Sequence, residues 1–234
     1  INKADKKGFD TKKLQALLSQ SKGRVDTKVP SEKQLTSLLE HYQRGRLDDA
    51  EKLAISMTQE FPTHQFGWKV LGAVLGQTGR NPEAVNANKE AVALYPQDAE
   101  SHNNLGITLQ ELGRLDEAEA SYTQAIALKP DFVDPRHNLG NTLKELGRLD
   151  EAEASYMQAI ALKPDFAEAH YNLGNTLKEL GRLDEAEASY TQAIALKPGS
   201  VDANYNLGNT LKELGRLDEA EASYTQAIAL KPDF

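Results

Sequence analysis

The stretch LGNTLKELGRLDEAEASY, residues 139–156, recurs unchanged at residues 173–190 and again at residues 207–224. A looser copy, LGITLQELGRLDEAEASY, stands at residues 105–122. Each copy begins 34 residues after the previous one, and glycine and proline keep this phase back to Gly45 and Pro62. A fixed period of this length is typical of a repeat array. It divides the chain into a leader, residues 1–30, and six units: 31–64, 65–98, 99–132, 133–166, 167–200 and 201–234.

Each unit predicts two helices. In the third unit, Leu105, Leu109 and Leu112 recur at helical spacing. Gly113 follows them, and glycine suits the left-handed conformation that often follows the last helical residue. The second half of the unit repeats the helical spacing and ends at a proline. The sequence therefore predicts an all-α protein built from pairs of helices.

The second helix of each unit carries signals for its start. We expect Asp116 to cap the first turn and Glu119, three residues later, to complete a capping box. Asp131 and Asp165 are expected to open the following units in the same way. The apolar stripe of the second helix is predicted to comprise Ala118, Tyr122, Ala125, Ile126 and Leu128.

Two features of the first helices need an explanation beyond the repeat itself. Glycine recurs in phase inside them, at a cost of about 1 kcal/mol each relative to alanine. We expect this cost to be offset by close packing of Gly106 opposite Ala118, and of the equivalent glycines Gly140, Gly174 and Gly208. The other feature is Pro135 of the fourth unit, which has no counterpart in the other units.

Pro135 is predicted to delay the first helix of the fourth unit. Proline is favoured as the first residue of a helix, where its missing N–H costs nothing. We therefore expect Asp134 to cap this helix and Pro135 to be its first residue.

The repeat resembles the tetratricopeptide repeat, whose 34-residue pattern begins W-x₂-L-G-x₂-Y and continues A-x₃-F and P. Trp68, Leu71 and Gly72 match its opening, although Leu75 stands where tyrosine is usual. Later units keep Leu-Gly and Ala-x₃-Tyr. The resemblance implies a right-handed superhelical solenoid of antiparallel helix pairs, with the first helices lining a concave groove. It also implies a scaffold that binds an extended peptide or a partner helix there.

The residues of the first helices that packing does not use are expected to face this groove. They include Asn103, Ile107 and His137. The predicted peptide-binding set is Asn104, Asn138, Asn141, Lys144, Tyr171, Asn172, Asn175, Lys178, Tyr205, Asn206, Asn209 and Lys212.

Four asparagines of this set share one phase: Asn104, Asn138, Asn172 and Asn206. An amide side chain has both donors and an acceptor, which suits the alternating groups of a peptide backbone. The ladder is similar to that in the repeat domain of O-linked N-acetylglucosamine transferases. The alternative is that these amides only bridge neighbouring repeats. A second binding mode of the family, a clamp that holds the carboxylate of a peptide C-terminus with lysine and arginine, is disfavoured. His137, Tyr171 and Tyr205 stand where such a clamp has lysine.

Aromatic residues allow two interpretations. Tyr171 and Tyr205 could anchor a ligand, because tyrosine combines a large contact area with a hydrogen-bonding hydroxyl. They could equally lie partly buried at the seam between units. Phe132, Phe166 and Phe234 stand at the joints between units and are expected to belong to the core.

Composition narrows the class of function. The net charge is −8, and the leader has eight Lys and Arg against three Asp, which leaves −13 for residues 31–234. An acidic body disfavours nucleic-acid binding, which requires basic contacts to phosphates. The chain has no cysteine, and its five histidines are scattered. No metalloprotease, phosphate-loop or serine-hydrolase motif is present. We expect no catalysis, no cofactor, no metal, no membrane span and a cytoplasmic location.

Both ends of the chain carry expectations. Leu14, Leu17 and Leu18 have helical spacing, so a short amphipathic helix is predicted over Thr11–Ser21. The last unit lacks the polar terminal helix that repeat arrays need for solubility, so we expect the natural protein to continue. End-to-end self-association is a second expectation. Two alternatives to a scaffold stay open: a substrate-recruiting arm of a glycosyltransferase-like or sulfotransferase-like enzyme, and a self-assembling structural spacer.

Overall fold

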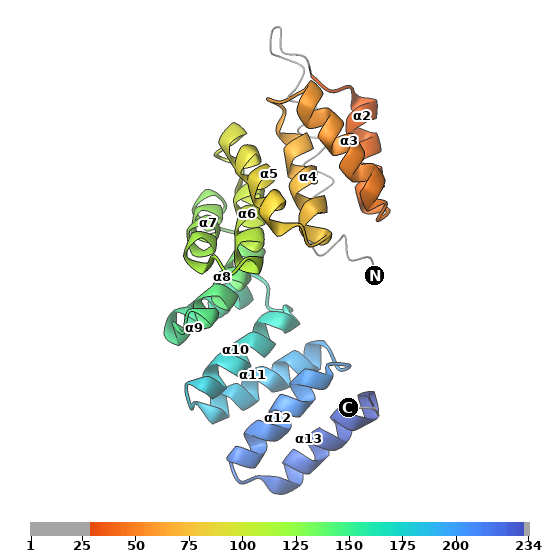
Figure 1. Ribbon diagram of the computed structural model, residues 1–234. Helices are drawn as coiled ribbons and strands as arrows, with labels where there is room; N and C mark the ends of the chain where they lie inside the picture. Colours follow the sequence, from red (N-terminus) through yellow and green to blue (C-terminus); the bar gives the residue numbers. More distant parts are fainter. Residues whose placement is uncertain (1–28, 232–234) are drawn as a thin grey trace. The chain divides into compact units, whose positions relative to one another are not determined.

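The computed structural model describes residues 29–231, and every regular element within that range is an α-helix (Figure 1). The leader helix predicted over Thr11–Ser21, and Phe234, lie outside the described residues. The helices are α2 (Glu32–Gln43), α3 (Leu47–Glu60), α4 (Gln65–Gln77), α5 (Asn81–Leu94), α6 (Ala99–Glu111), α7 (Leu115–Leu128), α8 (Val133–Glu145), α9 (Leu149–Leu162), α10 (Ala167–Glu179), α11 (Leu183–Leu196), α12 (Val201–Glu213) and α13 (Leu217–Leu230).

These helices form antiparallel hairpins in two compact units, α2–α7 and α8–α13, divided after Lys129. In each unit the second helix of one hairpin packs against the first helix of the next, as α9 does against α10. The first helices also contact one another across hairpins, so that α10 contacts both α8 and α12. The predicted all-α solenoid of helix pairs is confirmed.

The turn inside each hairpin is set by a glycine with positive φ. In α6 the Gly113 amide donates to the Gln110 carbonyl at 2.8 Å, and the Arg114 amide donates to the Leu109 carbonyl at 2.9 Å. This pattern satisfies the last carbonyls of the helix and requires a left-handed residue. The prediction for Gly113 is confirmed. Among residues 29–231, the glycines with φ between 69° and 79° are Gly45, Gly79, Gly113, Gly147, Gly181 and Gly215.

The predicted side-chain caps are wrong in most helices. Helix α7 begins at Leu115 with Arg114 as its N-cap, and no side chain bonds its first amides. Asp116 therefore lies inside the first turn, where a carboxylate is stabilised by the helix dipole without acting as a cap. The Gly113 and Arg114 amides bond the end of α6, and α7 begins at the next residue, Leu115.

The helices that follow the proline joints also differ from prediction. Phe132 and Phe166 are the N-caps of α8 and α10, so Asp131 and Asp165 do not cap them. Among the described helices, side-chain caps occur on α2, where Ser31 forms a capping box with Gln34, and on α12, where Ser200 accepts from the Ala203 amide at 3.3 Å.

The prediction for Pro135 is wrong as well. Helix α8 begins at Val133, two residues earlier than expected, and Pro135 is its third residue. The first amides of a helix have no carbonyl acceptor within the helix, so proline removes no hydrogen bond at this position. Asp134 consequently lies within the first turn and does not cap the helix.

The helix glycines do mark close packing, but their partner is a tyrosine instead of the predicted alanine. A Cβ atom on Gly174 would lie 2.7 Å from Cε1 of Tyr190, which is fully buried. The same ring–glycine contact recurs in four hairpins, through the pairs Gly106–Tyr122, Gly140–Tyr156, Gly174–Tyr190 and Gly208–Tyr224. Each hairpin of this kind is therefore closed by a ring lying on bare backbone.

We expect Gly174→Ala to destabilise the chain by about 1–2 kcal/mol, because a buried ring must move to admit the methyl group. The intrinsic preference of helices for alanine acts in the opposite direction by about 1 kcal/mol. Urea unfolding monitored by circular dichroism measures the balance. Gly199→Ala is the control, since no atom lies within 4 Å of its added Cβ. An increase in stability from Gly174→Ala would contradict the packing role.

Candidate functional site: the amide face of the second unit

Six asparagines gather on the first helices of the second unit, two each on α8, α10 and α12. All are half-buried. We call this surface the amide face, and it comprises Asn138, Asn141, Asn172, Asn175, Asn206 and Asn209. Asparagines three residues apart lie on one side of a helix, and contacts between the first helices align the three pairs.

The amides connect one hairpin to the next. The carbonyl oxygen of Asn175 accepts from the Tyr190 hydroxyl at 2.7 Å and from the side-chain nitrogen of Asn206, in the following hairpin, at 3.0 Å. One hairpin earlier, Asn141 accepts from the Tyr156 hydroxyl at 2.8 Å and from Asn172 at 2.9 Å. Both lone pairs of each carbonyl oxygen are therefore in use. The structure shows the bridging role that the sequence left as an alternative.

The tyrosine hydroxyls in this network are reliable donors. Burial raises the pKa of Tyr190 well above its ordinary value, so the hydroxyl keeps its proton near neutral pH. In the last hairpin the Tyr224 hydroxyl likewise donates to the asparagine of its own hairpin, Asn209, at 2.9 Å.

Each bridging asparagine has a second acceptor at the seam between hairpins. Asn206 also donates to the Tyr171 hydroxyl, and Asn172 donates to Nε2 of His137, both at 3.0 Å. Tyr171 is half-buried, which matches the seam interpretation. Tyr205 is 41% exposed, with its ring 5.8 Å from that of Tyr224.

The amide face keeps unused groups. The side-chain nitrogens of Asn141, Asn175 and Asn209 donate no hydrogen bond to a described residue, and the carbonyl oxygens of Asn172 and Asn206 accept none from one. Donors and acceptors of the same kind thus recur along the first helices of successive hairpins.

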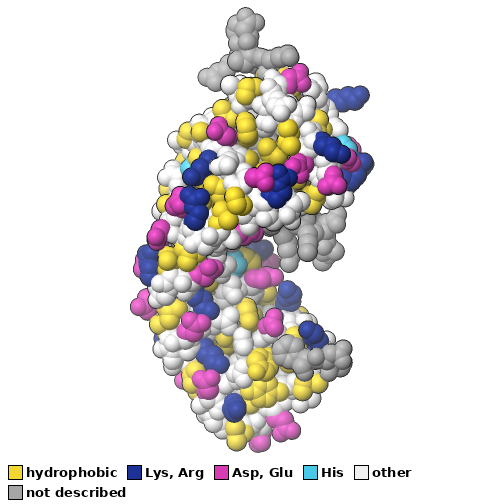
Figure 2. All heavy atoms as spheres, in the orientation of Figure 1, with side chains coloured by type: hydrophobic (Ala, Val, Ile, Leu, Met, Phe, Trp, Pro, Cys, Tyr) yellow, Lys and Arg dark blue, Asp and Glu magenta, His cyan; other side chains and the backbone are white. Residues whose placement is uncertain are grey.

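The lysines of the predicted set bridge hairpins. Lys144 pairs with Glu179 at 2.7 Å and Lys178 with Glu213 at 3.0 Å, each across one junction. Lys212 is exposed. Basic and acidic side chains are intermixed over the visible surface of this unit (Figure 2). Because two of the three lysines are neutralised, the amide face is polar without being strongly charged.

Residues 29–129 of the first unit form no comparable amide face. Asn104 is half-buried, and its backbone carbonyl accepts from the Asn88 side chain at 3.4 Å. Asn103 was expected in the groove but is only 3% exposed, so that prediction is wrong. The copies of this position, His137 and Tyr171, are half-buried. The position belongs to the seam between hairpins, which explains why a polar residue there is covered.

Sequence reasoning missed a buried ionic cluster in the first unit. Lys69 is 4% exposed and bonds Asp98 at 2.8 Å and Glu100 at 3.1 Å. Gln65 donates to Asp98 at 3.0 Å and to Ser101 at 2.9 Å. The partners are about one repeat apart in sequence, so only the stacking of α4 against α6 brings them together. Burying these charged groups costs desolvation free energy, which their close pairing partly offsets.

The phenylalanines at the joints are less buried than expected. Phe132 and Phe166 are both half-buried, so the prediction that they belong to the core is wrong. Phe166 lies beside His137, with ring centroids 4.8 Å apart, and Nζ of Lys163 lies 4.9 Å from its ring centre. The ring of Phe166 therefore contacts the ammonium group of Lys163 and the imidazole of His137, and is not enclosed in the hydrophobic core.

His137 is held in its neutral form. Burial is the main cause that lowers its pKa, and it outweighs the hydrogen bond to Asn138 and the charges of Asp134 and Glu168, which raise it. The contact with Asn172 requires Nε2 to accept, which a protonated imidazole cannot do.

We expect the second unit to lose stability as the pH falls below about 6.5, the ordinary pKa of histidine. The pKa of His137 is lower in the folded chain, so the unfolded chain binds more protons in that range. His137→Tyr supplies the residue found at Tyr171 and removes this titration. Urea unfolding at several pH values between 7.5 and 5 compares the two. If the free energy of unfolding changed with pH in the same way for the wild type and for His137→Tyr, His137 would not contribute to the loss of stability.

We expect Asn175→Ala to cost about 1–3 kcal/mol, because it leaves the buried Tyr190 hydroxyl without its acceptor. The matched variant is Asn209→Ala. The oxygen of Asn209 accepts one hydrogen bond, whereas that of Asn175 accepts two, and its donor Tyr224 is less buried than Tyr190. Its loss should be smaller in the same urea titration. Equal losses from the two variants would argue against a bridging role for Asn175.

Stacked helix pairs whose first helices share one polar face define a class, the helical-hairpin repeat proteins. A family model described as TPR repeat matches residues 72–113 and 140–181. Models described as Tetratricopeptide repeat match residues 99–132, 121–154 and 171–233. This chain belongs to the tetratricopeptide repeat family.

Solved structures give the same result for the fold. PilW, described as a widely conserved type IV pilus biogenesis factor, superposes with a TM-score of 0.78 at 22% identity, over 86% of this chain and 93% of its own. YrrB, described as a TPR protein with an unusual peptide-binding site, gives 0.64 at 22% identity, over 77% and 93%. MamA from Desulfovibrio magneticus RS-1 gives 0.66 at 21% identity, over 70% and 93%. No curated protein matches this chain.

Two structural features are absent from residues 29–231. None of the helices there has the length and apolar character needed to cross a membrane. That part of the chain also has no group of three or more histidine, aspartate or glutamate side chains placed to hold a metal ion.

Proposed function

We propose that this chain is a non-catalytic scaffold that binds an extended peptide on the amide face of the second unit. The observation that carries the proposal is the set of amide nitrogens on Asn141, Asn175 and Asn209, which recur once per hairpin and have no partner among the described residues. An extended backbone offers carbonyl acceptors at regular spacing, and side-chain amides are suited to bind them.

Pre-organisation supports the proposal. Each of these asparagines is fixed through its carbonyl oxygen by a tyrosine of the same hairpin, so the free nitrogen has a defined direction. A fixed donor loses little conformational freedom when it binds a ligand. The peptide-binding site in the printed description of YrrB gives a precedent on the same fold.

Charge favours one kind of peptide. Lys144 and Lys178 are paired with glutamates, which leaves little positive charge to hold a terminal carboxylate. Residues 130–234 contain ten Lys and Arg against eighteen Asp and Glu. The favoured ligand is therefore a neutral or basic peptide bound through its backbone, and an acidic or nucleic-acid ligand is disfavoured.

The test uses substitutions that change only the free side of each amide. In the triple variant Asn141→Asp, Asn175→Asp and Asn209→Asp, the retained oxygen still accepts from tyrosine, but the free donor becomes an acceptor. Peptides selected by display on the wild-type chain should bind this variant at least about tenfold more weakly, a difference of ~1.4 kcal/mol. Fluorescence anisotropy measures affinity, and urea unfolding should change little.

Two controls separate hydrogen bonding from added charge. Asn86→Asp places one negative charge on an exposed position of α5, outside the amide face, and should leave binding unchanged. The second control is the salt concentration. A loss of affinity caused only by the added charge would become smaller at higher salt, since exposed charges are screened over about 8 Å at physiological ionic strength. Unchanged binding by the triple variant, with its fold intact, would disprove peptide recognition on the amide face.

A further inference from the structure

The first helices of the second unit carry one ring per hairpin beside the unused amide donor. The rings belong to His137 on α8, Tyr171 on α10 and Tyr205 on α12, one repeat apart. Each stands four residues before an asparagine whose side-chain nitrogen has no partner among the described residues. Residues four apart lie on one side of a helix. Each hairpin of this unit therefore offers the same pair of groups, a ring and an amide donor.

The tyrosine rings are held by contacts within the unit. The ring centroid of Tyr171 lies 6.0 Å from that of Tyr190, and the centroid of Tyr205 lies 5.8 Å from that of Tyr224. The Tyr171 hydroxyl accepts from Asn206 of the next hairpin at 3.0 Å. Tyr171 is half-buried, so part of it is accessible to a ligand. A side chain that is fixed before binding loses little conformational freedom when a ligand contacts it.

Neighbouring first helices repeat this pair of groups at a short interval. Cα atoms of α10 lie within 8 Å of Cα atoms in both α8 and α12. The hydrogen bond from Asn172 to Asn141 measures 2.9 Å and that from Asn206 to Asn175 measures 3.0 Å, so the two junctions share one local geometry. The axes of packed helices are about 8–10 Å apart, so a ligand that contacts all three hairpins must repeat its chemistry at about that interval.

Among extended peptide conformations, polyproline II has this repeat. It has three residues per turn and rises about 3.1 Å per residue, so equivalent carbonyl groups recur about every 9 Å along one side. In a β-strand, groups on one side recur every second residue, at about 6.6–6.8 Å, which does not match the helix interval. Polyproline II also forms no internal hydrogen bonds, so its carbonyls are free to accept from asparagine nitrogens. The interval therefore favours a polyproline II ligand over a β-strand.

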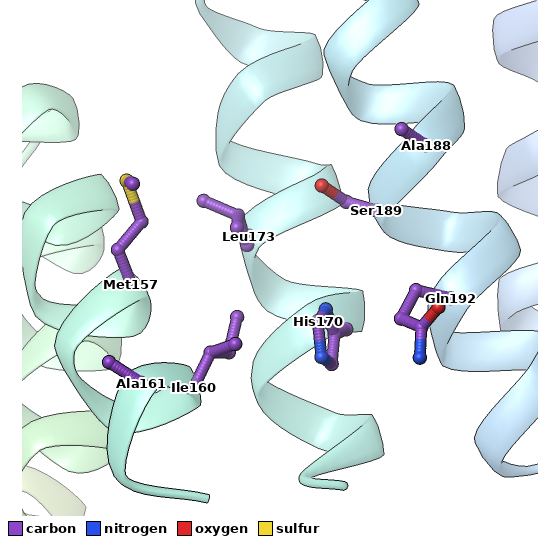
Figure 3. A pocket seen from close by; sticks show the side chains of 8 residues that line it. All are labelled: Met157, Ile160, Ala161, His170, Leu173, Ala188, Ser189 and Gln192. Atoms are coloured by element: carbon purple, nitrogen blue, oxygen red, sulfur yellow. The ribbon is translucent and has the colours of Figure 1, made fainter. Parts of the chain in front are cut away.

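A pocket elsewhere in the second unit does not offer this chemistry. It is open, has a volume of about 380 Å³ and lies between α9, α10 and α11 (Figure 3). Its lining is mostly apolar and includes Met157 and Leu173. The Ser189 hydroxyl already donates to a backbone carbonyl of its own helix at 2.9 Å, and Nε2 of His170 lies 3.0 Å from the Pro164 carbonyl oxygen. The pocket suits apolar side chains, whereas the amide face suits a peptide backbone.

We propose that the amide face binds peptides in the polyproline II conformation with proline at every third residue, which rests on the peptide-binding function proposed above. Proline rings pack against Tyr171 and Tyr205, as proline-rich ligands do in aromatic-lined grooves. Carbonyl groups of the peptide accept from Asn141, Asn175 and Asn209. Proline has no N–H, so such a peptide offers more acceptors than donors and matches a face with one unused donor per hairpin.

The experiment compares three fluorescein-labelled peptides, each titrated with the full chain and followed by anisotropy. The first peptide has five Pro-Gln-Ala triplets. The second has the same length and composition, but its prolines are alternately four and two residues apart, so no two neighbouring rings meet a proline. The third has valine in place of proline, which favours the β conformation. We expect saturable binding of the first peptide, at least about fivefold weaker binding of the second and at least about tenfold weaker binding of the third.

Variants of the chain test the ring. Tyr171→Ala should weaken binding of the triplet peptide at least about fivefold, through loss of the proline contact. Tyr171→Phe keeps the ring and should bind as the wild type does. The matched control is Tyr95→Ala, which removes an exposed tyrosine of the first unit and should leave binding unchanged. Circular dichroism checks that each variant keeps its helices, and the peptide comparison uses the unchanged chain.

Four outcomes would overturn the proposal. They are the absence of saturable binding by the triplet peptide, equal affinities for the first and second peptides, full affinity of the valine peptide, and equal losses from Tyr171→Ala and Tyr95→Ala. If display-selected peptides bind nonetheless and lose affinity in the triple asparagine variant, the amide face takes another peptide conformation and the proposed function stands. Triplet binding that falls with Tyr171→Ala, and persists with Tyr171→Phe, supports the polyproline II ligand.

Discussion

The second unit depends on one contact, a tyrosine ring lying on a helix glycine. At Tyr190 the ring closes the hairpin against Gly174, and the hydroxyl at its far end reaches Asn175 on the amide face. The same side chain thus joins the core of a hairpin to the amide face. A Cβ at the glycine would displace the ring, and a displaced ring would release the asparagine. Packing and surface chemistry are therefore set together by two residues.

The structure shows that the asparagines of the ladder bridge hairpins, and peptide binding by the same residues is our proposal. An amide has two functional ends, and the structure uses them differently. The oxygen of Asn175 is saturated by two donors, one of them from the next hairpin, while its nitrogen has no partner among the described residues. Bridging repeats and binding a peptide are consequently compatible roles for one residue. The bridge fixes the nitrogen in place, which lowers the entropic cost of using it.

The sequence predicted what depends on local geometry. The turn at Gly113 needs positive φ, and helical spacing of leucines defines the helix before it, so both followed from the residues alone. Predictions failed where the outcome depended on a partner elsewhere in the chain. Gly106 packs on Tyr122 and not on Ala118, because the larger ring reaches across the hairpin. The ionic cluster around Lys69 could not be foreseen, since its partners are brought by stacking.

The α4–α5 hairpin of the first unit shows what changes when the ring is missing. Asn88 stands where Tyr122 stands one repeat later, and it lies against Gly72. It bonds Thr108 of the next hairpin at 2.9 Å, in place of the tyrosine–asparagine bond within a hairpin. A short side chain closes the hairpin but cannot reach the surface where an amide ladder would lie. The α6–α7 hairpin is closed by Tyr122 as in the second unit, but Ile107 stands at the position of Asn141, and the Tyr122 hydroxyl donates to Gln110 at 3.1 Å instead. The amide face therefore requires both the closing tyrosine and an asparagine directly after the helix glycine.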